Sequence, residues 1–252
     1  MGNLQTGIAL WSDADSAHYW KIASDPSRTP DEYRLLLAGL LESHGLEAPA
    51  VAGSVLGCVV PELTPVFAEV LEKLCGGPPL VIGPGVRTGL QIRGEDPREA
   101  GADRIANAVA ARHRFGSPVV ACDFGTALAL DVVGSDGDYL GASIAPGIEV
   151  AAEALGRRAA RLGRVELKPP PRAIAANTIH GLQSGLVFGY VGMVEGLIRR
   201  VRDEIGPAPV IATGDGPWLP ALLGMTRSID AYDPLLTLRG LRLIHAHHTG
   251  RS

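Results

Sequence analysis

Residues 118–133 of this 252-residue chain read PVVACDFGTALALDVV. An apolar, β-branched run reaches Asp123, bends through Gly125 and Thr126, and resumes as a second apolar run, which predicts a β-hairpin. Glycine lets the backbone approach a bulky anion, and the N–H groups of a bend form a concave anion-binding surface. The stretch therefore predicts a phosphate site, with a cation held beside it by Asp123. A buried strand that ends in an ordinary turn is the alternative that these residues leave open.

The composition is that of a globular protein, because 46% of the residues are hydrophobic and 20% are charged, which excludes a disordered chain. The formal net charge of -4 argues against a nucleic-acid or anionic-membrane surface, since both need a basic patch. We find no apolar run of membrane-span length and no signal-like start in MGNLQ, so we expect a cytoplasmic protein. Cys58, Cys75 and Cys122 lack metal-ligand spacing and are expected to be reduced.

Strand-like and helix-like stretches alternate along the chain. One helix start is explicit: Thr29 as N-cap, Pro30 at the first helical position and Glu32 three residues after the cap. The other expected elements are a hairpin within 6–21, strands at 51–60, 79–82, 139–144 and 209–214, and helices at 64–75, 104–114, 148–162 and 177–202. This order predicts an α/β fold with two similar lobes, 1–115 and 116–252, around a central cleft. The tail 245–252, HAHHTGRS, is expected to be frayed, with solvated histidines.

Gly101-Ala102-Asp103-Arg104 precedes the predicted helix 104–114. An aspartate at a helix start is commonly only a cap. The functional interpretation is that Asp103 accepts a proton from a substrate hydroxyl while Arg104 binds an anionic group. The residues alone leave both roles open.

Three further segments carry candidate chemistry. Thr178 caps or enters the helix 177–202, or else donates its hydroxyl to a substrate across an interface. Thr213-Gly214 ends a strand in a bend of the kind that seats an adenosine. Gly2-Asn3 indicates a functional site only when it is considered together with the other candidate segments. The glycine run at 83–89 has the wrong spacing for a dinucleotide loop, and neither a Gly-Lys-Ser/Thr phosphate loop nor a nucleophile elbow is present in the sequence.

The order of these segments resembles the type III pantothenate kinase family over nearly the whole chain. The matching pieces are Gly2-Asn3, 24–33, 59–61, 83–90, 101–104, 123–126, 139–141, 144–147, Asn177-Thr178, 183–185 and Thr213-Gly214. The resemblance implies two ribonuclease-H-like lobes of the actin-like ATPase fold. It also implies a homodimer that transfers the γ-phosphoryl group of ATP to the 4′-hydroxyl of pantothenate, the first step of coenzyme A synthesis, and that needs Mg²⁺ and a monovalent cation, K⁺ or NH₄⁺.

The resemblance also implies roles for individual residues. Asp103 is similar to the general base of the family, and Asp123 to the ligand of the monovalent cation. The remaining assignments fall into two groups: a pantothenate site of Gly101, Ala102, Asp103, Arg104 and Thr178, and an ATP site of Gly2, Asn3, Gly125, Thr126, Thr213 and Gly214. Phosphoryl transfer needs positioning and charge neutralisation more than covalent chemistry, so these residue types suit it.

The sequence departs from the family at its start. The first phosphate hairpin of the family reads Asp-x-Gly-Asn-Thr after an apolar strand, whereas this sequence opens at Met1-Gly2-Asn3 and has Leu4 in place of the threonine. A start assigned several residues late and a truncated, impaired protein are the two explanations.

Other departures fall in the expected site. Leu128 and Ala129 stand where the family usually has hydroxyls, Gly94 where a tyrosine often contacts pantothenate, and Asp215 where a glycine follows Thr213-Gly214. They motivate two alternatives: a catalytically weak paralogue that acts as a small-molecule-binding regulatory protein, and a kinase for another small hydroxyl substrate.

The helix 177–202 carries glycines at 181, 185, 189, 192 and 196. Their three- and four-residue spacing places them on one face, where a second helix can approach closely. If that second helix belongs to another protomer, Thr178 lies near the interface. Packing against a helix of the same chain is the alternative.

Overall fold

A computed structural model of the chain describes residues 1–2, 4–12, 17–46, 51–93, 100–158 and 165–250. The chain divides into two compact units. The first comprises residues 1–89, 96–109 and 237–252, and the second comprises 90–95 and 110–236. The C-terminal helix is thus grouped with the N-terminal residues. The lobe boundaries expected from the sequence remain a prediction.

The second unit is built on a five-stranded sheet with the order β7-β6-β5-β8-β9. Its strands are β5 (Val119–Phe124), β6 (Ala127–Val133), β7 (Tyr139–Pro146), β8 (Val210–Gly214) and β9 (Ala231–Tyr232). The first three form an antiparallel meander, and β8 and β9 run parallel to β5. The predicted hairpin 118–133 is therefore confirmed, and this strand order is the one expected of a ribonuclease-H-like lobe.

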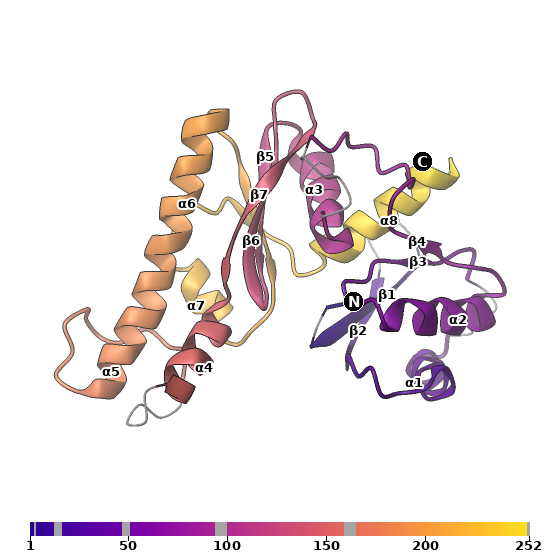
Figure 1. Cartoon of the computed structure of the whole chain (residues 1–252), viewed down its shortest axis with the longest axis horizontal. Helices are drawn as coiled ribbons and strands as arrows, with labels where there is room; N and C mark the ends of the chain where they lie inside the picture. Colours follow the sequence, from indigo (N-terminus) through magenta and orange to yellow (C-terminus); the bar gives the residue numbers. More distant parts are fainter. Residues whose placement is uncertain (3, 13–16, 47–50, 94–99, 159–164, 251–252) are drawn as a thin grey trace. The chain divides into compact units, whose positions relative to one another are not determined.

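Helices cover one face of that sheet. They are α4 (Ile148–Arg158), α6 (Gly189–Ile205) and α7 (Leu219–Leu223), seen on one side of the strands in Figure 1. The core between them is fully apolar at its centre, with Phe124 and Leu130 from the sheet packed with Val194, Ile198 and Leu219 from the helices. β5 and β8 are buried almost throughout, because strands in the middle of a sheet are covered on both faces.

The expected helix 177–202 is present as three consecutive segments. These are α5 (Thr178–Gln183), a π-helical stretch (Ser184–Phe188) and α6. We had expected no membrane-span-length apolar run, but by length and composition alone the 28-residue helix 178–205 reaches that limit, with a mean hydropathy of 1.2 in its most apolar window. Its leucine, valine, isoleucine, phenylalanine and methionine residues account for this value. Such a helix is weak support for a membrane span, since core helices have the same properties.

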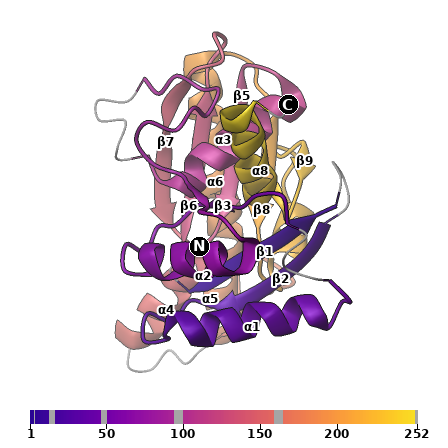
Figure 2. The same ribbon diagram turned by 90° about the vertical axis from the view of Figure 1, so that its right-hand side faces the viewer.

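The first unit contains the hairpin β1 (Gln5–Trp11) and β2 (Ala17–Ala23), the parallel pair β3 (Val55–Leu56) and β4 (Leu80–Val81), and helices α1 (Pro30–Glu42) and α2 (Leu63–Cys75). Figure 2 shows the β1–β2 hairpin beside α1 and α2. Tyr33 and Leu37 of α1 meet Leu63 and Phe67 of α2 in its core. The long strand expected over 51–60 is reduced to two residues.

Two helices connect to this unit. α3 (Ala102–Phe115) passes from the first unit into the second, and α8 (Leu236–Thr249) ends the described chain. The expectation of a frayed tail was wrong up to Thr249. Leu241 and Ile244 are buried, and Gly240 packs directly on α3, where an added Cβ would lie 1.9 Å from the Ala106 carbonyl oxygen. These packed residues precede the tail, and the helix that they anchor continues through it as far as Thr249.

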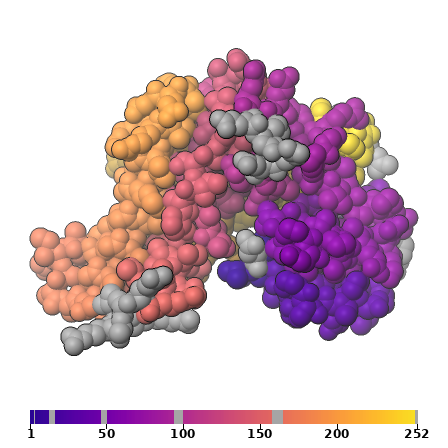
Figure 3. Space-filling model, viewed as in Figure 1, coloured from indigo at the N-terminus to yellow at the C-terminus, as the bar shows by residue number. Residues whose placement is uncertain are grey.

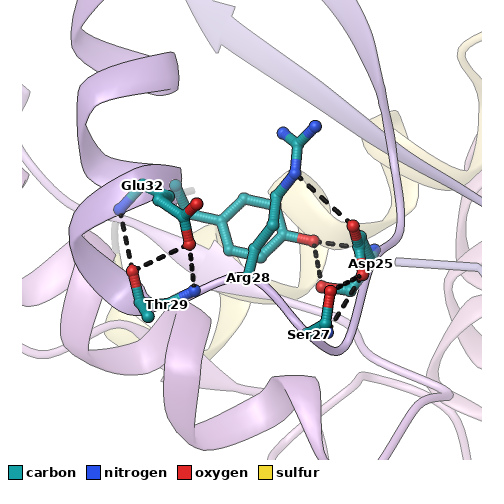
Figure 4. Close-up of polar contacts among 6 residues, drawn as sticks. Asp25, Ser27, Arg28, Thr29 and Glu32 are labelled. Atoms are coloured by element: carbon teal, nitrogen blue, oxygen red, sulfur yellow. Dashed lines mark hydrogen bonds and ion pairs between the residues drawn. The ribbon is translucent and has the colours of Figure 1, made fainter.

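The connection from β2 to α1 is fixed by a polar network (Figure 4). The predicted capping box is confirmed: the Glu32 amide donates to Thr29 Oγ1 over 3.3 Å, and the Thr29 amide donates to Glu32 Oε2 over 2.7 Å. The buried Tyr33 hydroxyl donates to the Asp25 carbonyl oxygen and accepts from the Asp25 amide. The motif 24–33 therefore has a structural role in this chain.

Candidate active site

The bend of the β5–β6 hairpin carries Asp123, Gly125 and Thr126. Gly125 and Thr126 are exposed, while Asp123 is half-buried. The Gly125 amide donates to the Ala127 carbonyl oxygen over 3.1 Å and closes the bend. The Asp123 Oδ1 atom lies 3.8 Å from where a Gly125 Cβ would be, so the carboxylate sits directly beside the bend. The bend carries the predicted carboxylate and hydroxyl, whereas the Gly125 amide is bonded within the bend, and the phosphate site stays a prediction.

The strand register brings Thr213 next to this bend. Asp123 is paired with Thr213 and Phe124 with Gly214 in the parallel β5–β8 ladder. Thr213 is only 2% exposed, so the surface that this turn offers to a ligand is the backbone of residues 214–216 and the exposed Asp215. Two segments that are far apart in the sequence thus meet at the carboxyl ends of adjacent strands, where ligands bind in open α/β sheets.

Two glycines allow the segments around the bend to touch through their backbones. An added Cβ at Gly147, where β7 leads into α4, would lie 2.3 Å from the Gly125 carbonyl oxygen. One at Gly214 would lie 2.3 Å from the Phe124 carbonyl oxygen. No side chain fits at either position. The hairpin bend, the β7–α4 junction and the end of β8 therefore form one tightly packed group.

The hairpin bend and the turn after β8 carry two carboxylates, Asp123 and the exposed Asp215. Burial raises the pKa of the neighbouring Cys122 thiol well above its usual value, and burial also raises the pKa of the Tyr190 hydroxyl. Both groups stay neutral at physiological pH, so neither adds a charge next to Asp123. Within the described residues, no three His, Cys, Asp or Glu side chains cluster as a metal site.

Asp103 is the second residue of α3, in the first unit, and it is half-buried. Its Oδ1 atom accepts the amide of Arg104 over 2.8 Å. A Cβ at Gly101 would lie 2.6 Å from the same oxygen, so Gly101 leaves the space that the carboxylate occupies. Ala102 is buried and Arg104 is half-buried. This contact is with the adjacent amide inside α3 and is not the N-cap bond to the second or third helical amide, so the role of base stays a prediction.

The other predicted residues lie apart from these groups or have structural contacts. Thr178 is exposed and is the first residue of α5, while Asn177 is the cap, its Oδ1 accepting the His180 amide over 2.9 Å. The Gly2 amide donates to the Gln5 carbonyl oxygen, and Ser24 Oγ donates to the Gly2 carbonyl oxygen. Asn3 lies outside the described residues.

The departures from the family fall into two structural classes. Leu128 is fully buried and Ala129 is 8% exposed, so both side chains serve the sheet core. Leu4 and Asp215 are exposed. Gly94 lies outside the described residues. The core positions explain why apolar side chains are kept in β6.

Two residues near the bend were missed by the sequence analysis. Trp218, which follows the β8 turn, donates its Nε1 hydrogen to Glu149 Oε1 in the first turn of α4 over 3.2 Å. Their only sequence signal was their position just after Gly147 and Gly216.

A pocket of about 480 Å³ in the first unit, lined by residues 52–54, 75–80, His245 and Thr249, includes none of the candidate residues.

Comparisons with known proteins agree with this arrangement. A family model described as type III pantothenate kinase matches residues 1–200. A type III pantothenate kinase of Moorella thermoacetica is 46% identical over 251 residues, covering 99% of this chain and 98% of the relative. The type III pantothenate kinase 2 of Symbiobacterium thermophilum is 43% identical over 252 residues, covering 98% and 95%.

Solved structures share the fold at low identity. A putative Baf family transcriptional activator from Campylobacter jejuni has a TM-score of 0.57 at 18% identity and covers 92% of both chains. Component A of the (R)-2-hydroxyglutaryl-CoA dehydratase of Acidaminococcus fermentans has a TM-score of 0.57 at 11% identity and covers 100% of this chain and 96% of the other. The fold is the mixed α/β fold of the actin-like ATPases, as expected. Because the family model matches residues 1–200 and these relatives match nearly end to end, the chain belongs to the type III pantothenate kinase family.

Proposed function

We propose that Asp103 is the general base of the reaction of this family. The chain is a phosphotransferase that phosphorylates pantothenate with ATP, generally as its Mg²⁺ complex. The observation that carries the assignment is the Asp103 carboxylate at the start of α3, in space that the missing side chain of Gly101 leaves open. A carboxylate within hydrogen-bond reach of the attacking hydroxyl supplies the base that the reaction needs. The test is pantothenate-dependent ADP release by the wild type and by Asp103→Asn.

The pantothenate site in this proposal comprises Gly101, Ala102, Asp103, Arg104 and Thr178. Arg104 would bind the pantothenate carboxylate, since a guanidinium pairs with a carboxylate through two parallel hydrogen bonds. The exposed Thr178 hydroxyl would reach the substrate from another protomer.

The ATP site in this proposal is the bend at Gly125-Thr126 with the turn after Thr213-Gly214, and Gly2-Asn3 in the first unit. The exposed Thr126 supplies a hydroxyl donor of the kind that phosphate oxygens require, while the Gly125 amide is already bonded within the bend. The backbone of residues 214–216, where Asp215 is exposed and the two glycines are half-buried, would support the adenosine. The Thr213 side chain is buried, so this residue would contribute by positioning the end of β8 and not by contacting ATP itself.

Asp123 is the proposed ligand of the monovalent cation. Its half-buried carboxylate beside the bend fits a K⁺ or NH₄⁺ ion that neutralises phosphate charge. Mg²⁺ usually keeps several waters and binds through substrate phosphates, so it needs few protein ligands. A Mg²⁺ ion bound in this way is compatible with the described residues, which contain no cluster of three metal-ligating side chains.

We also propose a homodimer that forms through the helix 178–205, which consists of α5, the π-helical stretch and α6 and is called the rod below. At Gly185, Gly189 and Gly192 an added Cβ would meet no atom of the described chain within 4 Å. The glycine face is thus open, which argues against packing on a helix of the same chain. Ile174 and Ile179 beside it are 87% and 59% exposed. The rod lies at the surface, as the orange atoms of Figure 3 show. A second copy of the rod fits this face.

The cytoplasm is the proposed location. All three cysteines, Cys58, Cys75 and Cys122, are free thiols, as in a reducing compartment. A weak, regulatory paralogue remains the alternative, motivated by Leu4 and Asp215 at exposed positions near the expected nucleotide contacts. Turnover measurements separate the two.

A further inference from the structure

The turn after β8 folds directly over the indole of Trp218. Gly216 has a φ of +152°, and an added Cβ there would lie 2.6 Å from Trp218 Nε1. The indole itself is 6% exposed and meets Phe124 and Tyr190 at ring-centroid distances of 6.3 Å each. The turn therefore rests on a side chain that is held by the core of the second unit.

The indole makes a hydrogen bond to a side chain of another element. Trp218 Nε1 donates to Glu149 Oε1 over 3.2 Å, and Glu149 lies two residues after Gly147, whose backbone packs on the hairpin bend. This hydrogen bond joins the turn after β8 to the start of α4. The hairpin bend and the turn after β8 are thereby connected through two side chains that are not members of the proposed ATP site.

We propose that the Trp218–Glu149 hydrogen bond is a positioning contact that sets the turn 214–216 for the adenosine of ATP. The inference rests on the proposed nucleotide site. Neither residue takes part in phosphoryl transfer. A turn ordered before binding loses less conformational entropy when the nucleotide arrives, so breaking the bond weakens nucleotide binding more than it slows the chemical step.

The test uses Glu149→Ala, which removes the acceptor, and Trp218→Phe, which removes the donor and keeps an aromatic ring. Both are expected to raise the Kd of ATP and its KM about 5–20-fold, a part of the free energy of a hydrogen bond to a charged group, because the bond acts on ATP only through the turn. The kcat and the KM of pantothenate should change less than about two-fold. Glu149→Gln keeps an acceptor oxygen and should restore most of the affinity.

The double variant Glu149→Ala with Trp218→Phe should bind ATP no more weakly than the weaker single variant, because both remove one bond. Thermal unfolding reports whether each variant is folded. Wild-type ATP affinity in both single variants would overturn the inference, as would equal losses of affinity and kcat. Thr126→Val tests the nucleotide site independently: unchanged ATP affinity there would contradict the proposed bend contacts, whatever the Glu149 variants show.

Discussion

At the scale of single residues, Asp123 has a half-buried carboxylate and neutral neighbouring side chains. Its carboxylate is half-buried beside an exposed bend, and its neighbours Cys122 and Tyr190 stay neutral because burial raises their pKa values. Negative charge at the proposed phosphate-binding bend, from Asp123 and from Asp215 in the neighbouring turn, repels ATP unless a cation accompanies it. The carboxylate therefore makes chemical sense as a cation ligand.

Asp123→Ala is expected to abolish the stimulation of activity by K⁺ or NH₄⁺ and to weaken ATP binding. The measurement is turnover as a function of K⁺ concentration at fixed ionic strength, with ATP affinity determined in parallel. Asp215→Ala is the control, because it removes an exposed carboxylate from the neighbouring turn and should keep the K⁺ dependence. An Asp123→Ala variant with unchanged turnover and unchanged K⁺ dependence contradicts the assignment.

At the scale of elements, the start of α1 depends on local chemistry. Thr29→Ala removes the hydroxyl that accepts the Glu32 amide and should lower the free energy of unfolding by about 0.5–2 kcal/mol. Thr29→Ser keeps the cap and should stay near wild type. Chemical denaturation of both variants is the measurement, and equal stability of Thr29→Ala and wild type would show that the cap contributes nothing.

The same cap has a pH dependence of known sign. Hydrogen bonds from the Thr29 amide and hydroxyl lower the pKa of Glu32. A carboxyl group whose pKa is lower in the folded state than in the unfolded state stabilises the fold at any pH above its unfolded-state pKa. This stabilisation is lost as the pH falls through its folded-state pKa. The stability gap between wild type and Thr29→Ala should therefore narrow in acid.

Elements with local signals were predictable, and those that depend on distant partners were not. The capping box at Thr29 and the bend at Gly125 follow from adjacent residues. α8 was missed because its helix is stabilised by α3 packing against Gly240, a contact between segments far apart in the sequence. The strand expected over 51–60 is short because Gly53 and Gly57 lie close against α8 side chains, where an added Cβ would be 2.9 Å from His245 and 2.8 Å from Leu241.

The candidate site shows the same division. Asp123 and Thr126 could be identified as candidate site residues from one sequence motif, and Thr213 from the separate motif Thr213-Gly214. That Asp123 and Thr213 are neighbours comes from the pairing of β5 with β8. The Trp218–Glu149 bond joins residues 69 positions apart and follows from packing alone.

At the scale of the whole molecule, the glycine face of α5–α6 predicts the assembly. Gly189→Leu should convert the dimer to a monomer and reduce activity with it. The monomer should remain folded, because no atom of the described chain lies within 4 Å of the new Cβ and leucine favours helix over glycine by about 1 kcal/mol.

Gly39→Leu is the matched control, since Gly39 is an exposed glycine of α1 with equally open space. It should leave the assembly unchanged. Sedimentation velocity at micromolar concentration gives the answer. A wild-type protein that sediments as a monomer rules out the shared-site proposal, and an unfolded Gly189→Leu variant would show that the face is covered by its own chain.

The most direct test of the account is ADP release by the wild type and Asp103→Asn at millimolar ATP and pantothenate, with Mg²⁺ and K⁺ present. The account predicts pantothenate-dependent ADP release by the wild type. It also predicts a loss of about 10²–10⁴-fold in kcat for Asp103→Asn with ATP affinity retained, because the change removes a base and keeps the shape. Wild-type release no greater than in a control without pantothenate, or near wild-type turnover by Asp103→Asn, would contradict it.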